Sequence, residues 1–147
     1  MAEREDPLVG FHFAVDIQGV VKGYFTSCSG LGSEHEVIEH KVVNEKGQEM
    51  VIKLPGRLKW DNIELERGIT SNMDIWTWRK KVEDGDVDGA RQNGSIVMYD
   101  QHLKEVARWN FERAWPIKIT DPQPKADSNQ IGVEKLTIAH EYIERVK

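Results

Sequence analysis

The sequence predicts a mainly β protein with one α-helix at about residues 71–83. Two observations predict this fold class. Residues 11–18 alternate, with four apolar side chains on one face, namely Phe11, Phe13, Val15 and Ile17. A period of two is that of a half-buried strand. Only the stretch at residues 71–83 carries apolar residues at helical spacing.

Length and composition exclude several classes of protein. The chain has 147 residues, of which 39% are hydrophobic and 31% charged, and its formal net charge is −5. These values favour a single globular domain over residues 1–147. Lys and Arg residues are scattered among acidic ones rather than gathered into a basic block, so we expect no nucleic-acid binding.

The sequence also indicates where the protein is made. Cys28 is the only cysteine, so no internal disulfide can form, which is typical of a reducing compartment. The opening MAEREDPLVG lacks the apolar core of a secretion signal. No apolar run approaches the roughly 20 residues of a spanning helix. We therefore expect synthesis in the cytoplasm and no stable membrane insertion of the monomer.

The β pattern continues after the first strand and is then interrupted. Gly19 turns the chain, and Val20–Thr26 returns as the second strand of a hairpin. Ser27–Gly32 is a run of small residues with too little bulk for a core. Such a run suits a bend or a close approach between backbones.

The next segment is an excursion with a charged tip. Glu36–Val43 predicts a strand, Asn44–Gly47 a turn, and Gln48–Leu54 a returning strand that ends at a Pro55–Gly56 turn. The excursion from His40 to Leu58 is poor in large apolar residues. It is either a solvated loop or a surface that becomes buried only against another molecule.

The stretch from Leu54 to Val82 joins the sheet to the helix. A strand over Arg57–Glu66 changes its apolar phase near Asp61–Asn62, which predicts a β-bulge. The helix follows, with Ser71 and Asp74 as its predicted capping arrangement. One face of the helix should pack on the sheet through Ile75, Trp78 and Val82.

The last part of the chain again predicts strands. Ser95–Tyr99 is apolar on both faces, as in a central strand. Val106–Trp115 alternates, with Ala107, Trp109, Phe111 and Trp115 toward the core and Arg113 breaking the row. A polar loop at Lys125–Gln130 precedes a long last strand at Gly132–Val146.

No set of residues forms a convincing catalytic, metal or cofactor site. Asp84–Gly89 fits the first half of a calcium loop, but the twelfth position is Ser95 rather than a carboxylate. His35 and His40 lie five residues apart, whereas zinc-binding helices need a spacing of four. We therefore expect no enzyme and no bound metal or cofactor.

Taken in order, several motifs resemble the tail-tube protein family of contractile phages and phage-derived contractile injection systems. The pieces are DPLVGFHFAVDIQG, GYFTSCSGL, KLPGRLKWDNIELERGIT, DIWTWRKKV, FERAWPIKIT and EKLTIAHEYIE. No single motif is specific, but the ordered set covers nearly the whole chain.

The resemblance implies a small antiparallel β-barrel or sandwich with one flanking α-helix, at about residues 71–83 here, and a structural role. In that family six copies close into a ring, and rings stack into a rigid hollow tube inside a contractile sheath. Sheath contraction drives the tube through a target envelope. The implied partners are further copies of the chain, the sheath protein, baseplate or initiator proteins, tube-terminator proteins and protein cargo in the lumen. The resemblance also implies an injection particle or virion tail as the site of action, and contact with nucleic acid only in a phage tail.

The family's long hairpin reaches the neighbouring ring and matches the excursion described above. We therefore predict a ring-stacking surface, with its last two residues shaping the base, at Asn44, Glu45, Lys46, Gly47, Gln48, Glu49, Pro55 and Gly56. Contacts of this kind are heterologous and propagate into filaments.

Three other interpretations stay open at the level of sequence. One is a tube-initiator ring at the baseplate, and another is a monomeric ligand-binding β-barrel. An enzyme is the third, although no coherent set of residues supports it. A stable monomer at all concentrations would contradict the ring interpretation.

Overall fold

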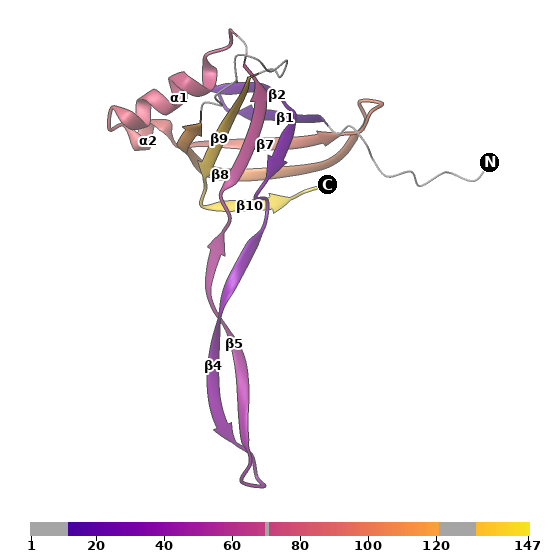
Figure 1. The fold of residues 1–147 in the computed structure, drawn as a ribbon, viewed down its shortest axis with the longest axis vertical. Coiled ribbons are helices and arrows are strands. Elements are labelled where there is room, and N and C mark those ends of the chain that lie inside the picture. The colour runs from indigo at the N-terminus through magenta and orange to yellow at the C-terminus, as the bar shows by residue number, and fades with distance from the viewer. Residues whose placement is uncertain (1–11, 70, 121–131) are drawn as a thin grey trace, which may run out of the picture.

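The computed structural model describes residues 12–69, 71–120 and 132–147. They form a β body with one helical edge and a long two-stranded arm that projects from it (Figure 1). The predicted polar loop at Lys125–Gln130 and Phe11 of the first strand lie outside the described residues. The predicted fold class, mainly antiparallel β, is confirmed.

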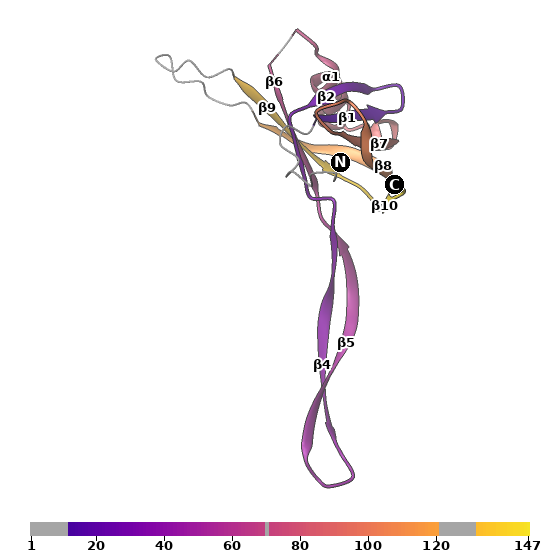
Figure 2. The same ribbon diagram turned by 90° about the vertical axis from the view of Figure 1, so that its right-hand side faces the viewer.

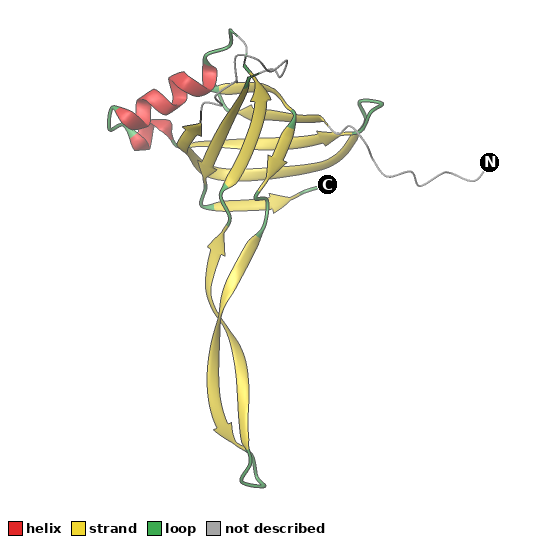
Figure 3. Cartoon of the chain, in the orientation of Figure 1, coloured by secondary structure: helices red, strands yellow, loops and turns green. Residues whose placement is uncertain are grey.

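The body is one antiparallel sheet that bends around a core (Figure 3). Its first half consists of β1 (His12–Ile17), β2 (Val21–Phe25), β7 (Gln92–Tyr99), β8 (Glu105–Thr120) and β10 (Tyr142–Arg145). The second half consists of β3 (Ser27–Ser29), β6 (Ile63–Gly68) and β9 (Val133–Ala139). The hydrogen-bonded order is β2-β1-β7-β8-β9-β6-β3, and β10 pairs with β8 beside this path.

The two ends of this path meet at Thr26. Strands β2 and β3 follow one another with only Thr26 between them, yet β2 pairs with β1 and β3 pairs with β6. The Thr26 N–H donates to the Glu66 carbonyl over 2.8 Å. The bent Val21–Ser29 segment therefore joins the first strand of the path to the last.

The predicted close approach after this segment is present. Gly30 has φ +80°, and a Cβ placed on it would lie 1.8 Å from the carbonyl oxygen of Asn62. Only glycine tolerates both the positive φ and this contact. The small-residue run therefore brings β3 against the chain between β5 and β6.

The core lies inside the curved sheet and extends to the helix. It follows the predicted alternation in β1, where Val15 and Ile17 are fully buried and Phe13 packs at the margin. The other large side chains that are fully buried are Val21, Phe25, Ile63, Leu65, Ile75, Trp78, Ile96, Phe111, Leu136 and Ile138.

The alternation of buried and exposed side chains shifts by one residue in the middle of strand β8. Arg113 has φ +53°, which breaks the alternation where the sequence indicated an interruption. Beyond it Ala114 and Pro116 are buried, whereas the predicted Trp115 is half-buried. The strand then runs on to Thr120, beyond the predicted end at Trp115.

The helical part differs from the prediction in two ways. Helix α1 (Asp74–Glu83) begins three residues after the predicted start and is capped by Met73 without a side-chain hydrogen bond, so the Ser71 cap is wrong. A second, one-turn helix α2 (Val87–Ala90) occupies the acidic connection. The Asp86 carboxylate caps α2 by accepting from the Gly89 N–H at 2.9 Å.

The arm is formed by β4 (Ser33–Val43) and β5 (Glu49–Trp60). The predicted Pro55–Gly56 turn is wrong, because β5 runs straight through both residues. Proline is tolerated in an edge strand or at a bulge, and Pro55 lies opposite a register shift between His35 and Val37. The pair therefore continues the strand instead of ending it.

Two predicted continuous strands are interrupted in the structure. The phase change at Asp61–Asn62 is where β5 leaves the arm and β6 enters the body, a break between strands rather than a bulge. The predicted strand over Gly132–Val146 is divided into β9 and β10 at His140–Glu141. Each break lets the chain change sheet partners.

Candidate assembly surface

The tip of the arm is a compact turn built by Asn44. Its side-chain Oδ1 accepts from the Lys46 N–H at 3.0 Å and the Gln48 N–H at 2.9 Å. Its carbonyl accepts from the Gly47 N–H at 3.0 Å. Gly47 has φ +76°, the positive value anticipated from the sequence. The predicted residues 44–49 thus form one ordered and exposed tip.

The shaft of the arm is far more apolar than the sequence interpretation held. It carries eight large apolar side chains that are at least 40% exposed: Val37, Ile38, Val43, Met50, Val51, Ile52, Leu54 and Leu58. The arm projects away from the body, as two perpendicular views show (Figure 2). So many exposed apolar side chains on one element indicate an interaction surface.

Pro55 and Gly56 lie midway along the arm rather than at its base. A Cβ on Gly56 would lie 2.9 Å from the Glu36 carbonyl oxygen and 3.1 Å from Cγ1 of Ile38. Glycine there permits the two strands to approach at the register shift. On the body side of the shift, Lys59 Nζ lies 2.9 Å from the Glu36 carboxylate, which lowers the pKa of that carboxyl.

An aromatic joint connects the arm to the body. The Trp60 ring lies 5.8 Å from the ring of His140 and 5.6 Å, edge-on, from that of Tyr142. His140 Nε2 is 3.0 Å from the Asp61 carbonyl, to which an Nε2–H donates. The last arm residue is thereby held against the β9–β10 break.

The joint should weaken in acid. Burial lowers the pKa of His140, against smaller opposing effects of hydrogen bonds with the backbone of Asp61 and Tyr142. Since the folded protein then binds fewer protons than the unfolded chain, stability is full above the ordinary histidine pKa of about 6.5 and is lost as pH falls below it.

The measurement is urea unfolding at about pH 7.5 and about pH 5.5, on either side of that pKa. We expect the free energy of unfolding to fall less in His140→Gln than in the wild type. His102→Gln, at an exposed position, is the matched control and should keep the wild-type pH dependence. An unchanged pH dependence in His140→Gln would contradict this role.

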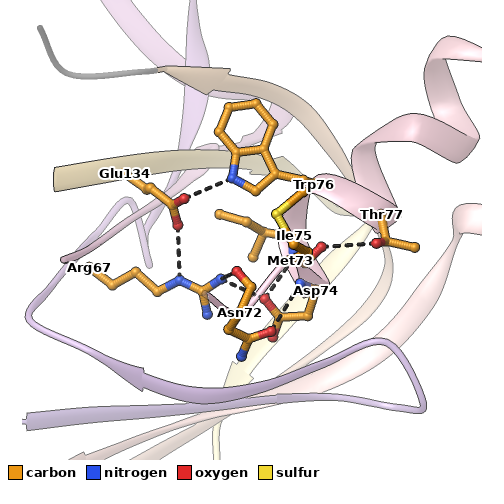
Figure 4. Close-up of polar contacts among 8 residues, drawn as sticks. All are labelled: Arg67, Asn72, Met73, Asp74, Ile75, Trp76, Thr77 and Glu134. Carbon is orange, nitrogen blue, oxygen red and sulfur yellow. Dashed lines mark hydrogen bonds and ion pairs between the residues drawn. The ribbon is translucent and has the colours of Figure 1, made fainter. Parts of the chain in front are cut away.

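Helix α1 is fixed to the body by a buried ionic network (Figure 4). Arg67 on β6 contacts Glu134 on β9 at 3.2 Å and Asp74 at the start of α1 at 2.5 Å. The Trp76 indole donates to the second Glu134 oxygen at 2.8 Å. Arg67 and Glu134 are over 90% buried, so this network joins two strands and the helix in the core.

The predicted helix-packing residues lie on the face of α1 that meets the body. Ile75 and Trp78 are fully buried, and Val82 is half-buried against the same core. The Trp78 indole donates to the Ala90 carbonyl at 2.6 Å, which ties α1 to α2. Farther along, Arg79 donates to the Pro116 carbonyl at 3.2 Å.

The described residues show little chemistry beyond packing and assembly. Among them, no group of three or more His, Cys, Asp or Glu side chains is placed to hold a metal ion. Burial raises the pKa of Cys28 to about 12, so its thiolate, the reactive form, is suppressed. No helix in this part of the chain is long and apolar enough to span a membrane.

The family of the chain follows from its sequence and agrees with this architecture. Residues 9–144 match the model of the T4-like virus tail tube protein gp19 family. The chain belongs to this family. The resemblance to tail-tube proteins is thus confirmed, and the structural role that defines the family applies to this tail-tube chain. Among curated proteins none matches it.

Solved structures share its fold. A chain in the PVC sheath-tube complex of an extracellular contractile injection system, in the extended state, is 24% identical with a TM-score of 0.76, and the match covers 96% of this chain and 92% of that one. A chain in the tube terminating cap of the anti-feeding prophage is 23% identical with a TM-score of 0.76, and the match covers 99% of this chain and 94% of that one. Hcp1 from Flavobacterium johnsoniae is 12% identical with a TM-score of 0.55, and the match covers 91% of this chain and 94% of that one. At these identities the likeness concerns the fold alone.

Two features of this tail-tube chain escaped the sequence interpretation. The ionic network could have been predicted from the sequence. Arg67 continues the alternation of Ile63 and Leu65 and therefore points into the core with them. Glu134 precedes Leu136 and Ile138 in the same way. The aromatic joint could not have been predicted from local sequence, because Trp60 and His140 are brought together only by the pairing of β6 with β9.

Proposed function

We propose that this chain is a structural subunit of the inner tube of a contractile injection system or phage tail. Its copies form hexameric rings, and the rings stack into a hollow, rigid tube that sheath contraction drives through a target envelope. We take residues 1–147 as one tail-tube domain. The chain acts by assembly and carries no enzymatic activity or cofactor.

The observation that carries this proposal is the arm. Strands β4 and β5 have no extensive contact with any described element except each other, and their apolar side chains are exposed. A strand of 11 residues spans about 35 Å, so the arm extends well beyond the body. Its partner is therefore another molecule, and in a tube of identical subunits this is a copy in the next ring.

The edges of the sheet support ring formation. Strand β2 has β1 as its hydrogen-bonded partner and β10 has β8, which leaves an edge of each open within the described residues. Open edges are aggregation hazards unless they are covered or paired. Heterologous contacts between neighbouring copies give closed rings when the rotation closes.

The remaining partners follow from the relatives. The similar structures are named as a sheath-tube complex, a tube terminating cap and a baseplate. We therefore propose that this chain contacts a sheath protein along the tube, baseplate or initiator proteins at one end and a terminator at the other, with cargo in the lumen. We place its synthesis and assembly in the cytoplasm and its action in a released particle.

The tip deletion tests the stacking surface. Removing Glu45–Gln48 should leave a folded subunit that no longer forms long tubes, because the exposed tip contributes nothing to the core. The measurements are thermal unfolding and negative-stain electron microscopy. Reversing the charge of Glu45 or of Lys46 individually is the milder control, since exposed ion pairs contribute under about 1 kcal/mol each. Full-length tubes from the deletion variant would contradict the assignment.

A further inference from the structure

The arm has two different faces. In an antiparallel ribbon, residues directly opposite one another point to the same face, and successive residues alternate between faces. The strand register therefore assigns every side chain from Val37 to Val43 and from Glu49 to Pro55 to one face or the other. This sorting separates apolar from charged residues.

One face has no formal charge. Its three cross-strand pairs are Ile38 with Leu54, His40 with Ile52, and Val42 with Met50. The other face has four charged residues, because its pairs are Val37 with Pro55, Glu39 with Lys53, Lys41 with Val51, and Val43 with Glu49. We call the first set of six residues the apolar face and the second set of eight the charged face.

We propose that the apolar face of the arm docks onto a second copy of this chain, while the charged face stays in water. This inference rests on the proposed function and names the surface that makes the stacking contact. The ring contact is then a band along the shaft, with the tip at its end.

The exposure of the apolar face supports this assignment. Ile38, Met50, Ile52 and Leu54 are 53%, 49%, 40% and 46% exposed. The three valines of the charged face are exposed as well, but charged residues lie beside them, whereas the apolar face carries none. Nothing in the described part of the chain covers them. Leaving a row of apolar side chains in water is unfavourable, and docking would remove this surface from water.

The position of the face selects a second copy as the occupant. Only the pair Val43 and Glu49 separates Val42 and Met50 from the tip at Asn44–Gln48, so the apolar face ends close to the proposed stacking surface. The arm also extends away from its own body (Figure 2). In a tube of stacked subunits we place the next copy there. A lipid or nucleic-acid partner would instead favour a basic rim, whereas the arm has five acidic and five basic residues between Ser33 and Trp60.

Adjacent residues of β5 provide a matched test. Ile52 lies on the apolar face and Val51 on the charged face, and both are exposed β-branched residues of the same strand. Asp has the same low strand propensity at both sites, so any difference reports the face. We expect Ile52→Asp to lower the mass that sediments as tubes by at least about tenfold, because it places a charge in an apolar contact.

Val51→Asp should assemble like the wild type, because the new carboxylate would lie opposite Lys41 on the charged face. Ile38→Asp and Val37→Asp form a second pair with the same expectation. Thermal unfolding checks that all four variants are folded. Equal assembly of the two members of a pair, or a greater defect on the charged face, would overturn the proposal.

The tip-deletion variant, measured in the same preparation series, separates the two hypotheses. If deletion abolishes tubes and Ile52→Asp behaves like Val51→Asp, stacking by the arm stands and the docking face assigned here is wrong. If tubes survive both the deletion and Ile52→Asp, the arm does not stack rings and both proposals fail.

Discussion

Replacing Arg67 by Met is expected to destabilise the subunit by about 3–5 kcal/mol, the cost typical of breaking a buried ion pair. The change leaves the carboxylates of Glu134 and Asp74 buried without their cation. One oxygen of Asp74 is buried without a hydrogen-bond partner even in the intact network. The guanidinium also packs 5.2 Å above the centre of the Phe25 ring, a contact that Met replaces only in part.

Urea unfolding of wild type and variant measures this loss. The matched control is Arg113→Met, whose ion pair with Glu141 is about half exposed and should contribute under about 1 kcal/mol. Adding Glu134→Gln to Arg67→Met should recover part of the loss, because it removes a buried charge at nearly constant volume. A double variant no more stable than the single one would show that volume, rather than charge, dominates.

Replacing Trp78 by Ala should cost about 3–5 kcal/mol, the range for truncating a buried aromatic side chain. Trp78 is the largest fully buried side chain, and it joins α1 to both the body and α2. Its indole N–H is also the donor to the Ala90 carbonyl. The loss therefore combines a cavity with an unsatisfied buried acceptor.

Two further variants separate these contributions in the same unfolding measurement. Trp78→Phe keeps much of the packing and should cost about 1–3 kcal/mol, mainly through the orphaned carbonyl. Lys81→Ala, on the exposed side of the helix, should change stability by under about 0.5 kcal/mol. If Trp78→Ala cost less than the Phe variant, the helix would not be anchored as described.

The sequence was informative where local pattern and tertiary structure agree. Alternation located β1, which buries one face, and a short run that is apolar on both faces, Ser95–Tyr99, located the second part of β7. The tip was predictable because Asn44 and Gly47 satisfy the turn with their own atoms. Local chemistry is sufficient at such places.

Other features depended on contacts distant in sequence. Pro55–Gly56 has the composition of a turn, but pairing with β4 keeps it extended. Asp74 has the position of a capping-box residue, but Arg67 binds its carboxylate, and α1 begins there. The apolar face of the arm was missed because its residues are divided between two strands and become a continuous row only in register.

The most direct measurement is a cryo-electron microscopy structure of tubes assembled from the purified chain. We predict rings joined by β4–β5 arms, with the apolar face of each arm seated on a copy in the next ring and the charged face in water. Tubes in which the arm lies free or contacts only its own ring would contradict the account, as would a preparation that stays monomeric at every concentration.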